Sequence, residues 1–301
     1  PRSIFDFMSE AQIDAVLSGT GALDVGDTVA AAINSAPLNS ALYFPSGVYN
    51  LGDSNLSISN LNCCHLIGAE SMPEFRWFGL ASNVDAISII GNSYRRGTIE
   101  NIIVNPGYSG QDAIKIYSGK AIRLRRVTVM YARRDSLSIY CNNFNWVERL
   151  LTHDVSLQGS GRNAITLEAA GPNGAFINES VFSSVEVRGV SLKETGGCAV
   201  VGVVSGTGNA KISEIQWNAC NFDAQRASSI ANGFDIGPNP MRLGYTPTGA
   251  NLFESWTING GSWETTTGPA DFRANGLVFA ERGTLPVGWK MLFGVSARWS
   301  S

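Results

Sequence analysis

The sequence predicts an all-β protein, a parallel β-helix with a short helical cap at its N-terminus. Helical periodicity is confined to residues 1–40, and no comparable period appears from Ala41 onward. Glycine makes up 33 of the 301 residues and supplies many turns. A short phrase that opens an alternating strand also recurs along the chain. Because 44% of the residues are hydrophobic and they are spread from end to end, the chain can bury a sizeable core.

Two short helices are expected before the strands begin. Ser9 has the position of an N-cap, and Gln12 three residues later completes a capping box. Asp27 is expected to cap a second helix that runs from Thr28 to about Ser35. The open end of a solenoid exposes unpaired backbone groups, so these helices are expected to cover it.

The recurring phrase places Asp or Asn before an alternating strand. It begins at Asp85, Asp112, Asp135, Asn163, Asn232 and Asn275. The first three intervals are 27, 23 and 28 residues. A second alternating strand follows each phrase, over Thr98–Val104, Ile122–Val129, Trp146–Leu157, Phe176–Val187, Ile212–Phe222 and Phe253–Trp263. A β-sandwich also contains many short strands but does not repeat one phrase in phase, whereas the stacked coils of a solenoid do.

Charge and composition exclude several classes of function. The formal net charge is −3 and no basic block is long enough to follow a phosphate backbone, so nucleic acid is not an expected partner. The longest apolar runs have the length of strands, so no membrane insertion is expected. Five cysteines without a CxxC pair and only two histidines predict neither a metal site nor a cofactor. The chain does not begin with Met, and we expect a processed chain or a fragment.

Four segments near the N-terminus follow one another in a specific order: Ser3–Glu10, Gly19–Asp24, Ala30–Asn34 and Leu42–Tyr49. In order and spacing they resemble the opening of the pectate-lyase-like β-helix domain in bacteriophage tailspikes and capsule depolymerases; further along, only the repeat character matches. The resemblance implies a right-handed, three-faced β-helix. It also implies a protein of the virion tail that binds and cleaves a bacterial surface polysaccharide, such as a capsule, exopolysaccharide or O-antigen, outside the host cell.

The resemblance further implies an assembly and a division of the chain. The family is usually homotrimeric and joins the phage tail through a preceding attachment segment, which this sequence lacks. We expect residues 1–40 to form the cap and residues 41–266 to form the β-helix that carries the glycan site. Residues 267–301 are expected to form a terminal coil and a C-terminal segment that makes trimer contacts.

Carboxylates recur in the second strands and indicate a chemistry. One set is expected to form a column: Glu100, Glu148, Glu179, Glu214 and Glu254. A second set follows six to ten residues later: Asp154, Glu186, Asp223 and Glu264. Adjacent coils lie roughly 4.8 Å apart, so carboxylates on neighbouring coils match the roughly 5–5.5 Å of a retaining glycosidase. Carboxylates two coils apart match the roughly 6.5–9.5 Å of an inverting one.

We therefore predict an endo-glycoside hydrolase in which at least two carboxylates of the central coils act as acid and base. The four candidates are Asp154, Glu179, Glu186 and Asp223. The alternative is that each carboxylate lies on the solvated face of its coil and pairs with an arginine such as Arg149, Arg188 or Arg226.

Aromatic and basic residues predict how a glycan is bound. Trp146 and Trp217 lie in or beside the second strands, and an indole face packs well against a pyranose ring. Tyr140 is a third aromatic candidate. Arg125 and Arg133 belong to a basic cluster whose forked guanidinium groups suit the carboxylates of acidic sugars. Core packing or trimer contacts are the alternative for the aromatic residues, and an intersubunit salt-bridge patch is the alternative for the arginines.

Two other functions stay open. A lyase would remove the C5 proton of a uronic acid with His153, a tyrosine or a basic residue. A non-catalytic adhesin would hold the glycan without cutting it. His153 and Asp154 are adjacent, and in a regular strand they would point to opposite faces, so they are not expected to form a dyad.

Overall fold

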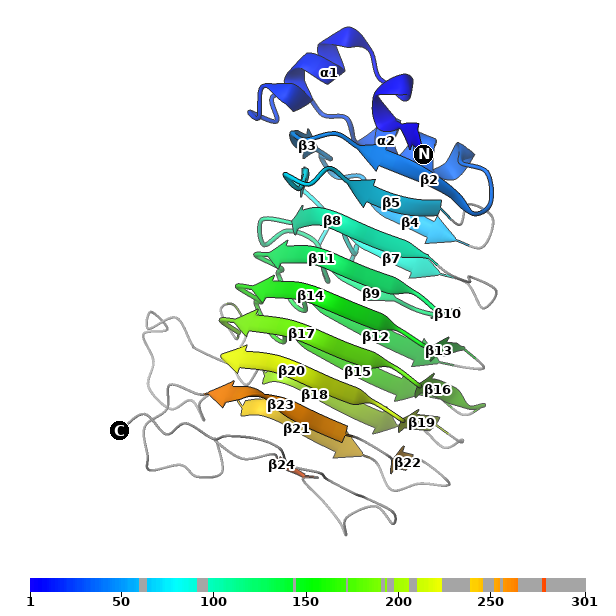
Figure 1. Cartoon of the computed structure of the whole chain (residues 1–301), viewed down its shortest axis with the longest axis vertical. Helices are drawn as coiled ribbons and strands as arrows, with labels where there is room; N and C mark the ends of the chain where they lie inside the picture. Colours follow the sequence, from blue (N-terminus) through cyan, green and yellow to red (C-terminus); the bar gives the residue numbers. More distant parts are fainter. Residues whose placement is uncertain are drawn as a thin grey trace.

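The chain folds as a right-handed parallel β-helix, shown as a computed structural model in Figure 1. The structure describes residues 1–59, 64–90, 97–142, 145–171, 173–190, 193, 198–205, 210–223, 239–245, 252–254, 257–264 and 278–279. Every strand pairing among these residues is parallel. The chain descends from the N-terminus with its near strands running to the left and its far strands to the right, which is the right-handed sense (Figure 1).

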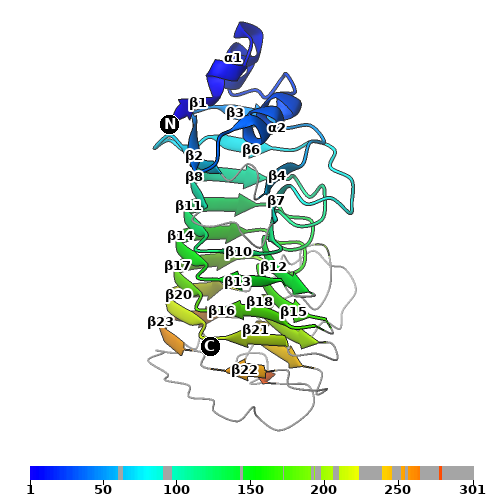
Figure 2. The ribbon, with the colours of Figure 1, turned by 90° about the vertical axis from the view of Figure 1, so that its right-hand side faces the viewer.

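Three sheets form the faces of the solenoid (Figures 1 and 2). Sheet A contains β1 (Arg2–Ser3), β2 (Ser40–Phe44), β5 (Cys64–Gly68), β8 (Thr98–Asn105), β11 (Arg123–Met130), β14 (Leu151–Gln158), β17 (Val181–Arg188), β20 (Gln216–Asp223) and β23 (Thr257–Glu264), with β3 (Val48–Asn50) and β6 (Glu74–Arg76) beside this path. Sheet B contains β4 (Leu56–Ser59), β7 (Ile87–Ile90), β9 (Ile114–Ile116), β12 (Leu137–Asn142), β15 (Ile165–Ala170), β18 (Cys198–Ser205), β21 (Asn239–Tyr245) and β24 (Val278–Phe279). Sheet C contains β10 (Gly119–Lys120), β13 (Trp146–Glu148), β16 (Ala175–Asn178), β19 (Ala210–Ser213) and β22 (Leu252–Glu254). One coil passes through sheets B, C and A in turn, as β12, β13 and β14 do.

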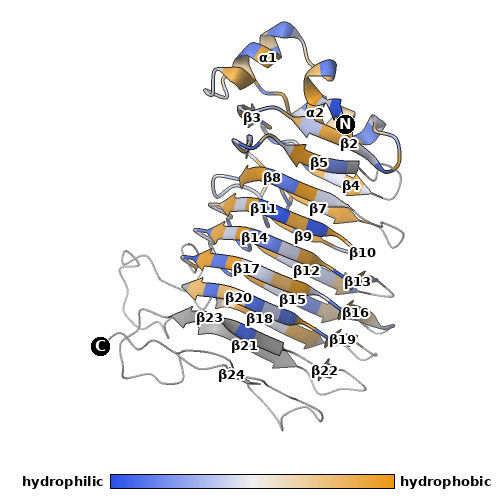
Figure 3. Cartoon of the chain, in the orientation of Figure 1, coloured by the Kyte–Doolittle hydropathy of each residue, from blue (hydrophilic) through white to orange (hydrophobic). Residues whose placement is uncertain are grey.

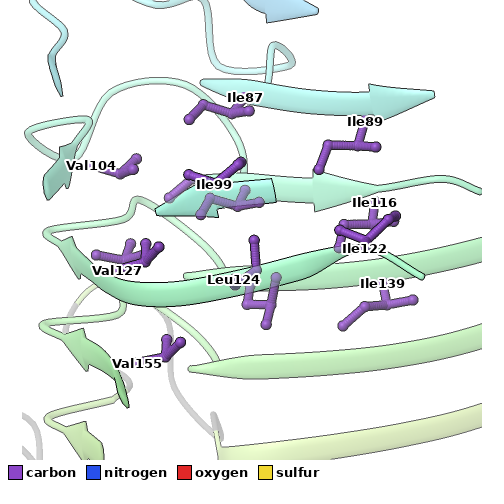
Figure 4. Close-up of a cluster of buried hydrophobic side chains, with 14 of the residues drawn as sticks. Ile87, Ile89, Ile99, Val104, Ile116, Ile122, Leu124, Val127, Ile139 and Val155 are labelled. Carbon is purple, nitrogen blue, oxygen red and sulfur yellow. The ribbon is translucent and has the colours of Figure 1, made fainter. Parts of the chain in front are cut away.

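Aliphatic side chains repeat at the inward positions and stack into ladders. In sheet B, Ile87, Ile114, Leu137 and Ile165 are in register and buried. Figure 4 shows part of the core, where isoleucine, leucine and valine side chains of successive coils lie between the sheets. Figure 3 shows the matching alternation of apolar and polar residues along the strands. Each fully buried aliphatic side chain stabilises the fold by about 1.5–3 kcal/mol, so every added coil contributes its own share of the core.

The first helix, α1 (Glu10–Leu17), begins with the predicted capping box. The Gln12 backbone N–H donates to Ser9 Oγ at 3.3 Å, and the Ser9 N–H donates to Gln12 Oε1 at 2.9 Å. A short 3₁₀ helix, η1 (Ile4–Phe7), precedes it. The helical segment covers the N-terminal end of the solenoid, as predicted (Figure 1).

The second helix, α2 (Gly26–Ser35), begins two residues earlier than predicted, and Asp27 is not its cap. The N-cap is Val25, which makes no side-chain cap hydrogen bond, and Asp24 Oδ1 instead accepts the Gly26 N–H at 2.8 Å. Asp27 lies in the first turn, where the helix dipole favours a carboxylate. Within the described residues, neither helix is long and apolar enough to cross a membrane.

Each long strand at the centre of sheet A is bent at one residue with a left-handed backbone. The bend residues are Asn101, Arg126, Asp154, Ser184 and Ala219, with φ between 50° and 56°. At every bend except that of the buried Asn101, two consecutive residues point outward before the inward alternation resumes. Arg125 and Arg126 are both exposed, for example, between the buried Leu124 and Val127. A regular strand would have turned one of the two arginines inward.

A second left-handed position follows each of the first four strands of sheet C. It is occupied by Ala121, Arg149, Glu179 and Glu214, with φ between 50° and 58°. This corner divides stretches that the sequence predicted as single strands: Trp146–Leu157 becomes β13 and β14, and Phe176–Val187 becomes β16 and β17. The corner residues are neither glycine nor asparagine, which are the usual residues at positive φ, so composition gives no signal for the corner.

A third left-handed corner follows the strands of sheet A. Tyr131, Gly159 and Gly189 are its equivalent residues on successive coils, with φ of 57°, 68° and 72°. Tyr108, with φ of 60°, lies at the same corner one coil earlier, and its N–H donates to the Tyr131 carbonyl at 2.6 Å. A left-handed backbone costs a non-glycine residue about 1–2 kcal/mol, and glycine avoids this cost.

Ala219→Gly should therefore raise the free energy of unfolding by up to about 1 kcal/mol, because glycine removes the Cβ that strains the bend of β20. Urea unfolding followed by circular dichroism measures the change. The control is Ala170→Gly at a regular position of β15, which should lower the free energy of unfolding by about 0.5–1 kcal/mol. Equal destabilisation by the two variants would contradict the strain at the bend.

Candidate functional site

The recurring Asp/Asn phrase forms a buried ladder at the corner where each coil enters sheet B. Asp85, Asp112, Asp135 and Asn163 stand just before β7, β9, β12 and β15 and are buried. The Asp112 backbone N–H donates to Asp85 Oδ1 and the Asp135 N–H donates to Asp112 Oδ1, both at 3.3 Å. The Asn163 N–H continues the ladder to Asp135 Oδ1 at 3.1 Å. The phrase therefore repeats because each carboxylate ties its coil to the next.

Three cations compensate the charge of this ladder. Lys115 Nζ lies 3.5 Å from Asp112 Oδ2, and Arg134 Nε lies 3.9 Å from Asp112 Oδ1. Arg162 donates two hydrogen bonds to Asp135, from Nε to Oδ1 at 2.8 Å and from Nη2 to Oδ2 at 2.5 Å. Burial still raises the pKa of Asp112 to about 6, and the Asp135 charge adds to this rise against the opposing effect of Lys115 and Arg134.

Beside the ladder, the outer face of sheet B carries two tyrosines, a lysine and a glutamate. Tyr117, Tyr140 and Glu168 occupy equivalent positions on three successive coils, because β9, β12 and β15 are in register. The tyrosine rings meet edge to face with centroids 6.3 Å apart, and Lys115 Nζ lies 5.0 Å and 5.6 Å from the Tyr117 and Tyr140 centroids. The Tyr117 hydroxyl donates to Asp85 Oδ2 at 2.8 Å. We call Lys115, Tyr117, Tyr140 and Glu168 the sheet B site.

Glu168 is the half-buried carboxyl of the sheet B site. Burial raises its pKa above the ordinary value, against the lowering effect of Arg162, Lys115 and Arg134. The charge of Asp135 acts in the same direction as burial. A carboxyl that holds its proton more tightly than usual is suited to the role of a general acid.

The sheet B site combines three chemical abilities. Its tyrosine rings have apolar faces and polar tips, which suits a pyranose ring with its hydroxyl groups. Lys115, with Arg134 and Arg162 nearby, suits an acidic substituent. Glu168 can donate a proton. Within the described part of the chain, no group of three or more His, Cys, Asp or Glu side chains is placed to hold a metal ion.

Sequence reasoning missed most of this site because it searched the second strands. A signal was present, since Tyr117, Tyr140 and Glu168 each stand five residues after the Asp or Asn that opens the phrase. In a solenoid, residues at the same place in successive repeats stack on one face. The three residues therefore predict a column on the surface of one sheet.

The first set of glutamates does not form the predicted column. Glu100 lies on β8, in register with Arg125, whereas Glu148 is the last residue of β13 in sheet C. Glu179 and Glu214 occupy the left-handed corner between sheets C and A. The prediction assumed one unbroken strand per coil, and the corner places these residues at three different positions of the coil.

The four residues predicted as acid and base lie on or beside sheet A, a different face from the sheet B site (Figure 1). Asp154 stands at the bend of β14, and Glu179 at the corner before β17. Glu186 lies within β17. Asp223 ends β20 in register with Arg188, and its side chain lies outside the described part. Their role as acid and base stays a prediction.

Two of these carboxylates have the arginine partners that the alternative interpretation expected. Arg149 Nε donates to Glu179 Oε2 at 2.6 Å, and Arg188 Nη2 donates to Glu186 Oε1 at 2.5 Å. Arg226, the third expected partner, lies outside the described residues. Solvent screens exposed pairs of this kind, and they contribute little to stability, as expected of a solvated face.

The predicted aromatic contacts lie in three separate places. Trp217 is fully buried and stacks on Phe182 with ring centroids 4.1 Å apart. Its prediction as a glycan contact is wrong, because a ring inside the core has no free face for a sugar. Trp146 is 36% exposed on the outer face of sheet C, in register with Phe176. Tyr140 is part of the sheet B site.

The predicted arginine contacts are also separated. Arg125 lies on the outer face of sheet A, with Nη1 3.3 Å from Glu100 Oε1. Arg133 lies in the loop after β11, and its Nη1 donates to the carbonyls of Ser82 at 3.0 Å and Gly110 at 3.3 Å. The basic cluster of the sequence is therefore divided between sheet A and the loop that leads into sheet B.

His153 and Asp154 point to the same face, contrary to the prediction. Both side chains are more than half exposed, and His153 Nδ1 lies 3.7 Å from Asp154 Oδ1. The left-handed backbone of Asp154 causes this, because the bend turns two successive residues outward. Strand alternation therefore does not separate the His153 and Asp154 side chains at this position.

Among the comparisons with known proteins, the likeness to one solved structure supports the fold. No family model matches the sequence, and no curated protein matches it. A Geobacillus virus E2 protein, ORF18, has a TM-score of 0.58 at 15% identity over 86% of this chain and 51% of that one, so the chain spans about half its length. The A-module of an Azotobacter vinelandii mannuronan C-5 epimerase has a TM-score of 0.42 at 14% identity, covering 87% of this chain and 89% of that one. The catalytic unit of a Streptomyces thermodiastaticus α-1,3-glucanase has a TM-score of 0.40 at 10% identity, covering 100% of this chain and 69% of that one.

Asp112→Asn should flatten the dependence of stability on pH. The pKa of Asp112 rises from its ordinary 3.8 to about 6 on folding, so the folded protein binds this proton more tightly than the unfolded chain. The stability from this group is complete below about pH 4 and is lost as the pH rises through about 6. Between pH 4 and pH 8 the parent should lose about 2 kcal/mol more of its free energy of unfolding than the variant. Urea unfolding at pH 4, 6 and 8 measures this difference, and parallel pH profiles would contradict it.

Proposed function

We propose that the protein is a bacteriophage tailspike depolymerase that binds a bacterial surface polysaccharide and cleaves it by endo-glycosidic hydrolysis at the sheet B site. The observation that carries the proposal is Glu168, a half-buried carboxyl whose pKa burial raises, in register with one of two paired tyrosine rings. The β-helix fold, which a Geobacillus virus protein shares, agrees with the resemblance of residues 3–49 to phage tailspikes.

In this proposal Glu168 is the general acid. It donates its proton to the leaving glycosidic oxygen while the bond from that oxygen to the anomeric carbon breaks. Tyr140, on the coil between Glu168 and Tyr117, offers its ring face to the pyranose at the point of cleavage. Lys115 attracts a carboxylate substituent of the glycan.

Tyr117 and Asp85 take the proton of the attacking water. The Tyr117 hydroxyl donates to Asp85 Oδ2, so the phenol passes its proton to Asp85 while it accepts one from the water. Two coil spacings, roughly 9–10 Å, separate Glu168 from Tyr117. This spacing leaves room for a water between the acid and the group that takes its proton, which is the arrangement of inverting glycosidases, so the product should have inverted anomeric configuration.

The pKa of Tyr117 favours hydrolysis over the lyase reaction at this site. A lyase with Tyr117 as its base needs the phenolate, but burial raises the pKa of Tyr117 and the hydrogen bond to Asp85 raises it further. The hydrolytic relay needs only the neutral phenol. Absorbance of an unsaturated uronate in the product would identify a lyase, and binding without any product would identify an adhesin.

The proposal includes an assembly and a location. The resemblance of residues 3–49 to tailspikes supports a homotrimer on the phage tail, joined to it by a segment before residue 1 and acting at the surface of the host bacterium. The substrate is a polysaccharide of that surface. No nucleic acid or membrane insertion is part of the proposal.

Glu168→Gln should lower the rate of polysaccharide cleavage roughly 10²–10⁴-fold, because the amide keeps the size of the side chain but donates no acidic proton. The assay incubates the protein with purified capsular polysaccharides and O-antigens and follows their length by size-exclusion chromatography. In the parent, kcat/KM should fall as the pH rises through the raised pKa of Glu168, since the acid form is then lost.

Glu100→Gln is the matched control, because Glu100 pairs with Arg125 on a different face and its loss should change cleavage by no more than a few-fold. The amide variants of Asp154, Glu179, Glu186 and Asp223 test the prediction made from the sequence. If one of these abolishes cleavage and Glu168→Gln does not, the hydrolase acts on sheet A and the assignment to sheet B is wrong.

A further inference from the structure

Two tyrosines occupy a corner of the solenoid that neighbouring coils give to glycine. Tyr131 has a left-handed backbone with φ of 57°, whereas the equivalent residues of the next two coils are Gly159 and Gly189. Tyr108, with φ of 60°, lies at the same corner one coil earlier and directly follows Gly107. Glycine adopts this conformation without strain, so a stable corner does not require tyrosine. The choice of tyrosine calls for a role on the surface.

The two rings form a small aromatic platform. Their centroids lie 5.4 Å apart with an interplanar angle of 52°, and Tyr131 is 46% exposed. An exposed phenol ring presents an apolar face and a hydroxyl group at its edge, which are the two contacts that a sugar ring needs.

Gly159 makes room for this platform. A Cβ atom at Gly159 would lie 3.1 Å from Tyr131 Cδ1 and 3.3 Å from Tyr108 Oη, closer than ordinary van der Waals contact. The missing side chain therefore lets both rings lie against the backbone of the next coil. The glycine and the two tyrosines behave as one structural unit across three coils.

A cation completes the platform. Lys193 Nζ lies 4.4 Å from the Tyr108 ring centroid, and the Lys193 backbone N–H donates to the Gly161 carbonyl at 2.9 Å. An ammonium group over an aromatic face is attracted by the ring and is available to an anion beside it. The platform thus joins an aromatic surface to a positive charge.

We infer that Tyr108, Tyr131 and Lys193 form a binding subsite for a pyranose ring that bears a carboxylate, outside the sheet B site. In this subsite the pyranose ring packs on the Tyr131 side chain, and the carboxylate of the sugar faces Lys193. The loop that begins at Tyr131 continues to Arg134 beside Asp112, so the subsite lies next to the sheet B site along one corner of the solenoid. The inference rests on the proposed function and names its substrate class, an acidic polysaccharide.

The test is affinity electrophoresis in native gels that contain polygalacturonate, alginate or, as an uncharged comparison, dextran. The parent should be retarded by at least one of the two acidic polysaccharides and much less by dextran. Tyr131→Gly should weaken the retardation at least tenfold, and it should fold, because glycine already occupies this corner in two other coils. Tyr131→Phe keeps the ring but loses the hydroxyl, so its retardation should lie between that of the parent and that of Tyr131→Gly.

Phe176→Ala is the matched control, since Phe176 is 39% exposed on the outer face of sheet C, and its retardation should equal that of the parent. Equal retardation of Tyr131→Gly and the parent overturns the inference, and so does a parent that neither acidic polysaccharide retards. A lower molecular mass of Tyr131→Gly in light scattering also overturns it, because the ring would then contact a second copy of the chain.

The same gels separate this inference from the proposed function. Glu168→Gln should be retarded like the parent even though it no longer cleaves. If the parent binds but cleaves nothing, the hydrolase proposal fails and the subsite stands. If cleavage depends on Glu168 and the retardation does not depend on Tyr131, the subsite fails and the hydrolase proposal stands.

Discussion

Parallel in-register pairing between coils governs this structure, because it sets each side chain directly against its equivalent in the next coil. For inward positions this is favourable, and isoleucine, leucine and valine stack into continuous ladders, with helices contributing to the core at the N-terminal end. Polar and charged side chains are also set directly against their equivalents in the next coil. A carboxylate at a repeated position meets another carboxylate, so every charged column must be compensated within the fold.

The Asp/Asn ladder shows how the chain meets that requirement. Each carboxylate accepts a backbone N–H from the next coil, and lysine and arginine side chains lie between or beside the stacked charges. Arg162 forms a bidentate pair with Asp135, whereas the pKa of Asp112 stays raised by burial and by the Asp135 charge. The Asp135 charge also raises the pKa of Glu168, so the ladder that fastens the coils contributes to the chemistry of the surface beside it.

The sequence predicts the elements of this fold better than the faces on which its residues lie. The capping box at Ser9, the parallel coils and the four copies of the phrase from Asp85 to Asn163 follow from spacing and composition and are confirmed, whereas the copies at Asn232 and Asn275 lie outside the described residues. The carboxylate columns are wrong because bends at residues such as Asp154 and corners such as Glu179 use left-handed backbones without glycine. One such residue changes which of the following side chains face outward. Strands matched by sequence spacing alone are therefore out of register beyond it.

The absence of left-handed bends from its described residues suits sheet B to hold side chains at fixed separations. No described residue of sheet B has a positive φ, so its strands keep strict alternation and its columns are true columns. The spacing from Tyr117 to Tyr140 to Glu168 is then fixed by the hydrogen bonds between coils. On sheet A each bend except that at Asn101 instead turns an extra residue outward, which widens the surface and moves side chains out of line. A rigid column can hold an acid and a base at a defined separation, and a bent strand offers a broader face for binding.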